Sequence, residues 1–198
     1  MKILHLISSP RGAASFSIKL SNAIVEKLQA KNADSTVKVH SLVNTPFPHL
    51  EEAHLNSFFT PAESRSPEQA EAVKHSDEAI AELFDADAIV IGAPMYNFGI
   101  PSTLKAWIDH IARAGITFKY GENGPEGLVK NKKVYLAIST GGVYSERPMK
   151  VYDFTEPYLR AVLGFLGMTD VTAFRVEGVN MPDLKDSALE KAIEKITI

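Results

Sequence analysis

The sequence predicts an α/β domain in which a doubly wound, five-stranded parallel sheet carries helices on both faces. Five apolar runs rich in β-branched residues alternate with amphipathic helical patterns along the chain. Three of these runs are nearly continuous, which is typical of strands covered on both faces, as in parallel sheets. Strands that alternate with helices, joined by right-handed crossovers, place helices on both faces of such a sheet.

Turn residues bound each of the predicted strands. In chain order they are Lys2 to Ile7, Thr36 to Leu42, Ala88 to Ala93, Lys133 to Thr140 and Asp170 to Val176. The first, third and fourth are the continuous apolar runs, so we expect them to be covered on both faces of the sheet.

Helical patterns separate the strands. After the first strand, apolar residues recur at helical spacing from Phe16 to Leu28. The capping box that begins at Ser66, with proline at the first helical position, predicts a helix that runs toward Phe84. The remaining predicted helices begin at Pro101, run from Pro157 to Phe165, and run from Ser187 to Ile196.

The segment from Thr45 to Ser66 is the least regular part of the chain and is rich in proline, serine and aromatic residues. It is either a surface loop or a lid or interface element, since long irregular segments in compact domains are often functional. The chain has 198 residues and no internal repeat, so we expect a single domain over residues 1–198.

Composition and charge exclude several classes of function. The net charge is −3 and there is no basic run, which argues against binding to nucleic acid or to an anionic membrane. The absence of cysteine rules out disulfides and thiolate chemistry, and the histidines lack metal-ligand spacing. No signal-peptide pattern or membrane-span-length apolar stretch is found, so we expect a soluble, cytoplasmic protein.

Two histidines invite a catalytic interpretation that the sequence does not favour. His5 lies in a predicted strand and is expected to be a hydrogen-bonded core residue. Asp109-His110 resembles half of a catalytic dyad, but adjacent helical residues do not face each other. One of the two is therefore expected to be buried and the other exposed.

A serine-rich loop, Ser8 to Ser17, follows the first strand and leads into a helix. Free backbone N–H groups and the helix dipole favour an anion at such a position. The loop lacks the dinucleotide fingerprint and the Walker pattern, so it suits a single terminal phosphate, to which Arg11 could add charge. Serines before a helix can also act only as N-caps.

The loops after the third and fourth strands supply two further features. Tyr96, Asn97 and Phe98 form either a wall for a flat ring or a hydrophobic loop folded against the next helix. Gly141 and Gly142 either let backbone amides approach a ligand closely or form an ordinary turn.

These three loops meet at one place if the strand order is 2-1-3-4-5. In this flavodoxin-like order, strands one, three and four are neighbours, so their carboxyl-end loops converge on the crevice at the topological switch point. A phosphate cradle, an aromatic wall and a glycine-rich edge are the parts that a flat mononucleotide such as flavin mononucleotide (FMN) needs.

Over nearly its whole length, the chain resembles the FMN-dependent NADH azoreductase family, which belongs with the flavodoxin-like NAD(P)H:quinone reductases. The motifs that carry this resemblance are Ser9-Pro10-Arg11-Gly12, Ser15-x-Ser17, Pro94 to Pro101, Leu104 to Asp109, Ser139-x-Gly141-Gly142 and Leu163 to Gly167. The block from Pro94 to Pro101 is the most specific of them.

The resemblance implies a homodimer with two flavin sites at its interface. The loops and the resemblance together give the cofactor-binding residues as Ser9, Arg11, Ser15, Phe16, Ser17, Pro94, Met95, Tyr96, Asn97, Phe98, Ser139, Thr140, Gly141 and Gly142. The serines are assigned to the phosphate and ribityl chain, the second loop to the isoalloxazine, and the third loop to its pyrimidine edge. Tyr120 and Phe165 are expected to line the substrate pocket, with Asn97 and Tyr144 as candidate catalytic residues.

The activity that the resemblance implies is ping-pong transfer of a hydride from NADH or NADPH through FMN to a quinone or azo compound. Thr140 replaces a frequent arginine and Tyr144 replaces a histidine of some members, which bears on substrate preference and proton delivery. Two alternatives stay open: a flavodoxin-type electron carrier, although such carriers are usually more acidic, and a flavin-free interaction domain.

Overall fold

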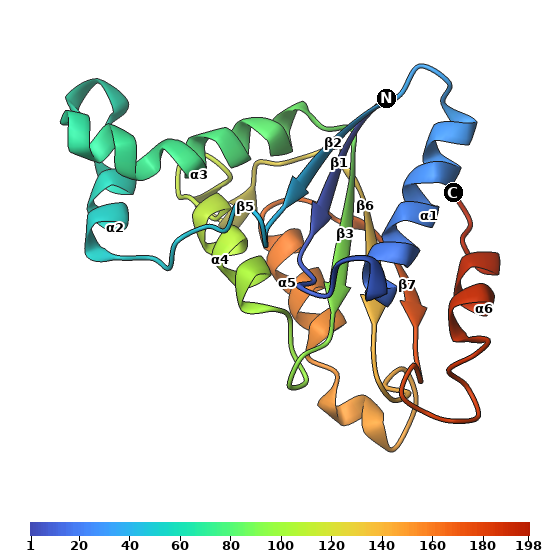
Figure 1. Ribbon diagram of the computed structural model, residues 1–198. Coiled ribbons are helices and arrows are strands. Elements are labelled where there is room, and N and C mark those ends of the chain that lie inside the picture. Colours follow the sequence, from blue (N-terminus) through green and yellow to red (C-terminus); the bar gives the residue numbers. More distant parts are fainter.

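A five-stranded parallel sheet forms the centre of the computed structural model, which describes residues 1–198. Its strands are β1 (Lys2–Ile7), β2 (Thr36–Ser41), β3 (Ala88–Pro94), β6 (Lys133–Ser139) and β7 (Asp170–Val176). Their spatial order is β2-β1-β3-β6-β7, which is 2-1-3-4-5 within the sheet, so the predicted fold class is confirmed (Figure 1). Each predicted strand agrees with the observed one to within one residue.

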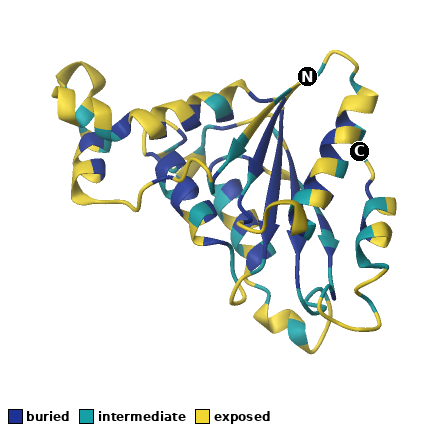
Figure 2. Cartoon of the chain, in the orientation of Figure 1, coloured by how far each residue is buried: buried dark blue, intermediate teal, exposed yellow.

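Burial explains why the central strands have continuous apolar sequences. Every residue of β3 is buried, and in β6 only Lys133 is not (Figure 2). Both faces of these strands are covered, so neither face can accept polar side chains. The edge strand β2 has no buried residue, in keeping with a sequence that alternates between polar and apolar residues.

Five helices cover the two faces of the sheet (Figure 1). One face packs against α1 (Phe16–Lys31) and α6 (Ala188–Glu194) around 13 buried apolar residues. The other face carries α3 (Pro67–Asp85), α4 (Ser102–Ile111) and α5 (Thr155–Phe165) around 24 buried apolar residues. Because successive strand residues point to opposite faces, Ile3 belongs to the first core and Leu4 to the second.

The segment from Thr45 to Ser66 contains a helix that the sequence analysis did not predict. This helix, α2 (Glu52–Phe59), is followed by the 3-10 helix η2 (Ala62–Ser64). A capping box begins α2, and the Glu51 N–H donates to His54 Nδ1 at 3.1 Å. The helix buries only His54 and Ser57, so it lacks the apolar stripe by which a helix is found from sequence.

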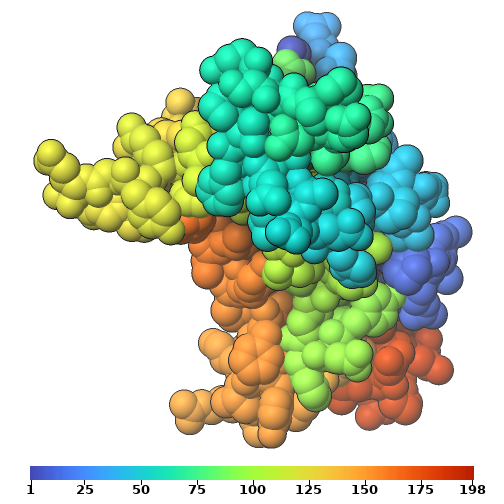
Figure 3. Space-filling view, turned by 90° about the vertical axis from the view of Figure 1, so that its left-hand side faces the viewer, coloured from blue at the N-terminus to red at the C-terminus, as the bar shows by residue number.

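A second unpredicted element is the antiparallel hairpin of β4 (Phe118–Gly121) and β5 (Gly124–Gly127), drawn in yellow where it projects from the body in Figure 3. Its strands are four residues long and show no alternating pattern, which hides them from sequence analysis. At its base, Gly127 lies so close to Gly167 that a Cβ would be 2.1 Å from the Gly167 nitrogen.

Two more short 3-10 helices, η1 (Gly12–Ala14) and η3 (Met149–Tyr152), lie in the loops at the carboxyl end of the sheet. The helix α5 begins two residues before the predicted Pro157, because Asp153 caps it by accepting the backbone N–H of Thr155 at 3.0 Å. No helix of the chain combines the length and the apolar character that crossing a membrane requires.

Candidate functional site

A pocket of about 170 Å³ lies at the carboxyl edge of the sheet, beyond the ends of β1, β3, β6 and β7. Its walls are formed by Ser9, Arg11, Ser15, Phe16, Pro94, Met95, Tyr96, Ser139, Thr140, Gly141, Val179 and Asn180. Ten of the fourteen cofactor residues expected from the sequence are among them. The three loops therefore converge as the strand order requires.

The serine-rich loop places three buried hydroxyls at the start of α1. Ser15 is the N-cap, and its Oγ accepts the Ile18 N–H at 3.4 Å and lies 3.0 Å from the Oγ of Ser17. The Ser9 Oγ accepts the Arg11 N–H at 3.4 Å. In the bonds to Arg11 and Ile18 the serine oxygens act as acceptors, so these bonds leave the hydroxyl protons able to donate to an anion beside the positive end of the helix.

The loop after β3 makes a tight turn with an uncommon backbone. Asn97 and Phe98 both have left-handed conformations, with φ of 49° and 70°. Tyr96 and Gly99 exchange two backbone hydrogen bonds, of 3.0 and 3.1 Å, which close the turn. An aromatic residue in this conformation costs on the order of 1 kcal/mol or more, and such strain concentrates at functional sites. The turn holds Tyr96 and Phe98 half exposed beside the pocket.

The loop after β6 presents a row of free donors. The backbone N–H groups of Gly141, Gly142 and Val143 make no hydrogen bond within the chain. The next two amides, of Tyr144 and Ser145, both donate to the Glu177 carboxylate at 2.9 Å. Consecutive unpaired amides beside a pocket suit the carbonyl or ring-nitrogen edge of a flat polar ligand.

Two residues of the pocket, Val179 and Asn180, were missed by the sequence analysis. They follow β7, and their segment pairs with the third loop: the Asn180 N–H donates to Gly141 O at 3.0 Å. A Cβ on Gly141 would lie 2.7 Å from Asn180 Nδ2, so a larger residue at 141 would displace the Asn180 side chain or the loop. Applying the rule of strand carboxyl ends to β7 as well would have found both residues.

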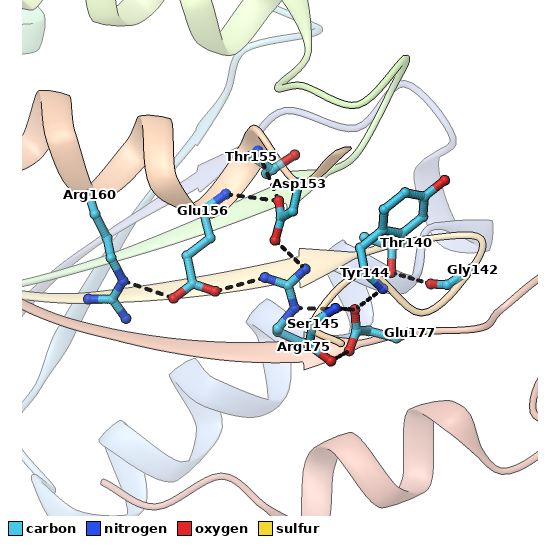
Figure 4. A network of polar contacts seen from close by, with 10 residues as sticks. All are labelled: Thr140, Gly142, Tyr144, Ser145, Asp153, Thr155, Glu156, Arg160, Arg175 and Glu177. Carbon is cyan, nitrogen blue, oxygen red and sulfur yellow. Dashed lines mark hydrogen bonds and ion pairs between the residues drawn. The ribbon is translucent and has the colours of Figure 1, made fainter. Parts of the chain in front are cut away.

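Four of the expected cofactor residues border the pocket without lining it: Ser17, Asn97, Phe98 and Gly142. The Tyr144 ring makes an edge contact with Phe98 at 6.3 Å between ring centres, and Tyr152 lies on Phe98 at 5.3 Å. In Figure 4 the Tyr144 ring points away from Glu177, while its backbone nitrogen points toward that carboxylate. The candidate catalytic residues Asn97 and Tyr144 therefore lie on the rim.

The two expected substrate residues lie elsewhere in the chain. Phe165 ends α5 and packs against Phe118 of the hairpin at 4.5 Å between ring centres. Tyr120, on the same hairpin, is 74% exposed. The 11 residues of α5 span about 16 Å from the pocket end of the sheet, so one chain does not bring Tyr120 and Phe165 to its own pocket.

Two histidines are structural, as expected. His5 is 3% exposed, and its Nε2 lies 2.7 Å from the Oγ of Ser21. Burial lowers the pKa of His5 to about 4, so the ring is neutral near pH 7. His110 is buried against Pro48 O, whereas Asp109 is partly exposed and paired with Lys105.

A larger groove, of about 670 Å³, lies between β2 and α3. Its charged side chains already pair with each other: Lys2 with Asp85 at 2.5 Å, and Lys38 with Glu82 at 2.9 Å. It lies away from the carboxyl ends of the strands, where ligands of such sheets bind, so we do not assign a ligand to it.

The sheet order and a polar pocket at the switch point define a protein of the flavodoxin-like class. A family model described as "Flavodoxin-like fold" matches residues 1–197. An FMN-dependent NADH:quinone oxidoreductase of Mesorhizobium japonicum is 50% identical over 197 residues, which are 99% of this chain and 94% of that protein. One of Herminiimonas arsenicoxydans is 54% identical over 180 residues, covering 91% and 88% of the two chains.

Among solved structures, an azoreductase from Bacillus anthracis strain Sterne matches with a TM-score of 0.91 and 31% identity, covering 98% of this chain and 96% of that one. The chain therefore belongs to the flavodoxin-like family that includes the FMN-dependent NADH:quinone oxidoreductases. This confirms the family resemblance that the sequence motifs indicated.

Proposed function

We propose that this protein is an FMN-dependent NAD(P)H oxidoreductase that reduces quinones and aromatic azo compounds. The observation that carries the proposal is the convergence of buried serine hydroxyls, a strained aromatic turn and three free amides around one pocket. The names of the relatives and of the similar structure support the same activity. They do not favour the alternative of an electron carrier without a small-molecule substrate.

The residues present fit FMN. Ser9, Ser15 and Ser17 offer buried hydroxyls at a helix N-terminus, which suits a terminal phosphate. Met95 and Tyr96 offer an apolar wall for a flat ring, with Asn97 and Phe98 completing the turn. The free amides from Gly141 to Val143 offer donors for its polar edge.

When bound, FMN supplies the redox chemistry, which is the transfer of two electrons from NADH or NADPH to the acceptor. The chain binds, orients and tunes it. The unpaired amides of Gly141 and Gly142 would donate to the polar edge of the bound ring and would stabilise negative charge there, in the manner of oxyanion-hole donors. The Asn97 side chain can donate a hydrogen bond from the turn, and the Tyr144 hydroxyl can hold a proton at Oη near the rim.

We further infer a homodimer of single domains that span residues 1–198. Tyr120 is exposed on a projecting hairpin and lies far from its own pocket, so the proposed substrate role requires it to reach the pocket of a partner. The NADH that the reaction consumes is a cytoplasmic reductant, and we place the protein in the cytoplasm.

Anaerobic half-reactions test the proposal. The protein is loaded with FMN, and its visible spectrum is followed as one equivalent of NADH and then a benzoquinone are added. We expect the flavin bands to bleach with NADH and to return with the quinone, which would establish ping-pong turnover. Flavin that binds but ignores both NADH and NADPH, and forms a stable semiquinone on photoreduction, would contradict the proposal and favour the electron carrier.

A further inference from the structure

We propose that Arg175 and Glu177 are positioning residues for two loops at the rim of the proposed flavin pocket, the turn after β3 and the loop after β6. Together they hold both loops in one conformation. They do so through the polar network in Figure 4, which joins the end of β7 to the third loop and to the start of α5. The inference rests on the proposed function, because it concerns how tightly the chain holds FMN.

Glu177 fixes the third loop. Its carboxylate accepts the N–H groups of Tyr144 and Ser145, each at 2.9 Å, and the Ser145 hydroxyl at 2.5 Å. These two amides directly follow the three free amides from Gly141 to Val143. Because neighbouring peptide planes share only two soft torsions per residue, fixing 144 and 145 limits the directions in which the free N–H groups point.

Arg175 connects this loop to α5. Its guanidinium lies 2.7 Å from Glu156, 2.8 Å from Asp153 and 3.4 Å from Glu177. Asp153 also caps α5. One largely buried cation therefore forms ion pairs with three carboxylates that come from both sides of the rim.

The same guanidinium reaches the aromatic turn through the backbone. The Phe154 N–H, next to Asp153, donates to Phe98 O at 3.1 Å. Since Phe98 has a left-handed backbone, this bond helps to hold a conformation that the residue does not prefer by itself. The turn after β3 and the loop after β6 are thus both connected to the Arg175 side chain, through Asp153 and Glu177 respectively.

Arg175 and Glu177 both stay charged near neutral pH. Burial alone would lower the pKa of Arg175, but Glu177, Asp153 and Glu156 raise it above its ordinary value. Burial would raise the pKa of Glu177, but Ser145, Tyr144 and Arg175 hold it below its ordinary value.

The sheet itself does not depend on these two side chains. The strand β7 pairs with β6 over seven residues from Lys133↔Asp170 to Ser139↔Val176, and neither Arg175 nor Glu177 belongs to an apolar core. Removing either of these two side chains should therefore loosen the two loops more than it destabilises the fold.

The test compares Glu177→Ala, Glu177→Gln and Arg175→Met with the wild type and with Arg160→Met. Arg160 is a matched control, because it pairs with Glu156 on the exposed side of α5 but touches neither loop. For each protein we would measure the FMN dissociation constant by fluorescence quenching, the melting temperature of the FMN-free protein, and hydrogen exchange of peptides covering 96–99 and 141–145.

We expect Glu177→Ala and Arg175→Met to weaken FMN binding at least tenfold and to speed exchange in both peptides, with exchange in β6 unchanged. Glu177→Gln keeps one acceptor oxygen and should weaken binding about threefold, and Arg160→Met should match the wild type. If Glu177→Ala does not fold, the FMN affinity and hydrogen exchange of Glu177→Gln and Arg175→Met test the inference.

Two results would overturn the inference: unchanged FMN affinity in the folded variants, or a lower melting temperature with no local change in exchange, which marks a purely structural role. A wild-type protein that fails to bind FMN would instead refute the proposed function, so the two failures are distinguishable.

Discussion

At the scale of single residues, His5 makes the stability of the fold depend on pH. Its folded pKa is about 4 because of burial, whereas an exposed histidine titrates near 6.5. Between these values the unfolded chain binds a proton that the folded chain excludes, so stability rises with pH across the window. Below pH 6.5 the stability falls, and about 3 kcal/mol is lost by pH 4 through this group.

We therefore expect the free energy of unfolding of the FMN-free protein to fall by about 2 kcal/mol between pH 7 and pH 5 through His5 alone. The measurement is urea denaturation at both pH values for the wild type and His5→Gln, in which the side-chain amide can still bond Ser21. The variant should lose less stability by that amount. An equal loss in both proteins would show that His5 does not titrate as its burial requires.

Gly141 is the second residue with a specific consequence. A Cβ there would lie 2.7 Å from Asn180 Nδ2, so Gly141→Ala must displace Asn180 or the loop. We expect FMN affinity to fall about tenfold, a loss of about 1.4 kcal/mol. When Asn180 is already alanine, the side chain that a Cβ at 141 would meet is gone. Gly141→Ala should therefore reduce FMN affinity less in the Asn180→Ala protein than in the wild type. Additive losses in the FMN titrations would contradict the steric explanation.

The sequence reveals residue types at this scale more readily than backbone shape. The serines before α1 and the glycines after β6 were found because their roles depend on composition next to a strand end. The left-handed conformation of Phe98 was not predicted from the sequence, because tertiary contacts such as the Phe154–Phe98 hydrogen bond help to impose it. Glu177 and Arg175 carried no motif, since their partners are distant in sequence.

At the scale of elements, the hairpin of β4 and β5 makes a prediction about the substrate. Tyr120 is exposed and does not contact its own pocket, so Tyr120→Ala should leave FMN affinity unchanged. If a partner's hairpin lines the pocket, KM for a benzoquinone should rise about three- to tenfold, in line with loss of about 1 kcal/mol of aromatic contact.

The measurement is steady-state kinetics with varied quinone, and sedimentation shows whether the variant is still dimeric. Lys119→Ala, at the neighbouring position of the same strand, is the control because alternate residues of a strand point to opposite faces. An unchanged KM in a dimeric Tyr120→Ala variant would show that the hairpin does not line the substrate pocket.

Elements with strong apolar patterns were the ones that the sequence predicted well. The strands β1, β3 and β6 are nearly continuously apolar and the helices α1, α3 and α4 are amphipathic, so the sequence pattern indicates which of their residues are buried. The helix α2 buries a histidine and a serine, and the hairpin strands have four residues each; neither shows a period long enough to detect.

At the scale of the whole molecule, the strand order of the sheet determines which loops meet at the pocket. Residues from four widely separated segments meet because β1, β3, β6 and β7 are neighbours that end at the same edge. This is why alternation of strands and helices, with no knowledge of contacts, was enough to place three loops together.

Whether the pocket binds FMN through the serines at the start of α1 is tested by an FMN titration of three proteins: the wild type, the double variant Ser15→Ala with Ser17→Ala, and Ser64→Ala. Ser64 is an exposed serine of η2 with no contact to the pocket, so it is the matched control. An FMN site at the serine-rich loop requires saturable 1:1 binding to the wild type and the control, with affinity at least tenfold lower in the double variant. Equal affinity in all three proteins, or no binding to any, would contradict it.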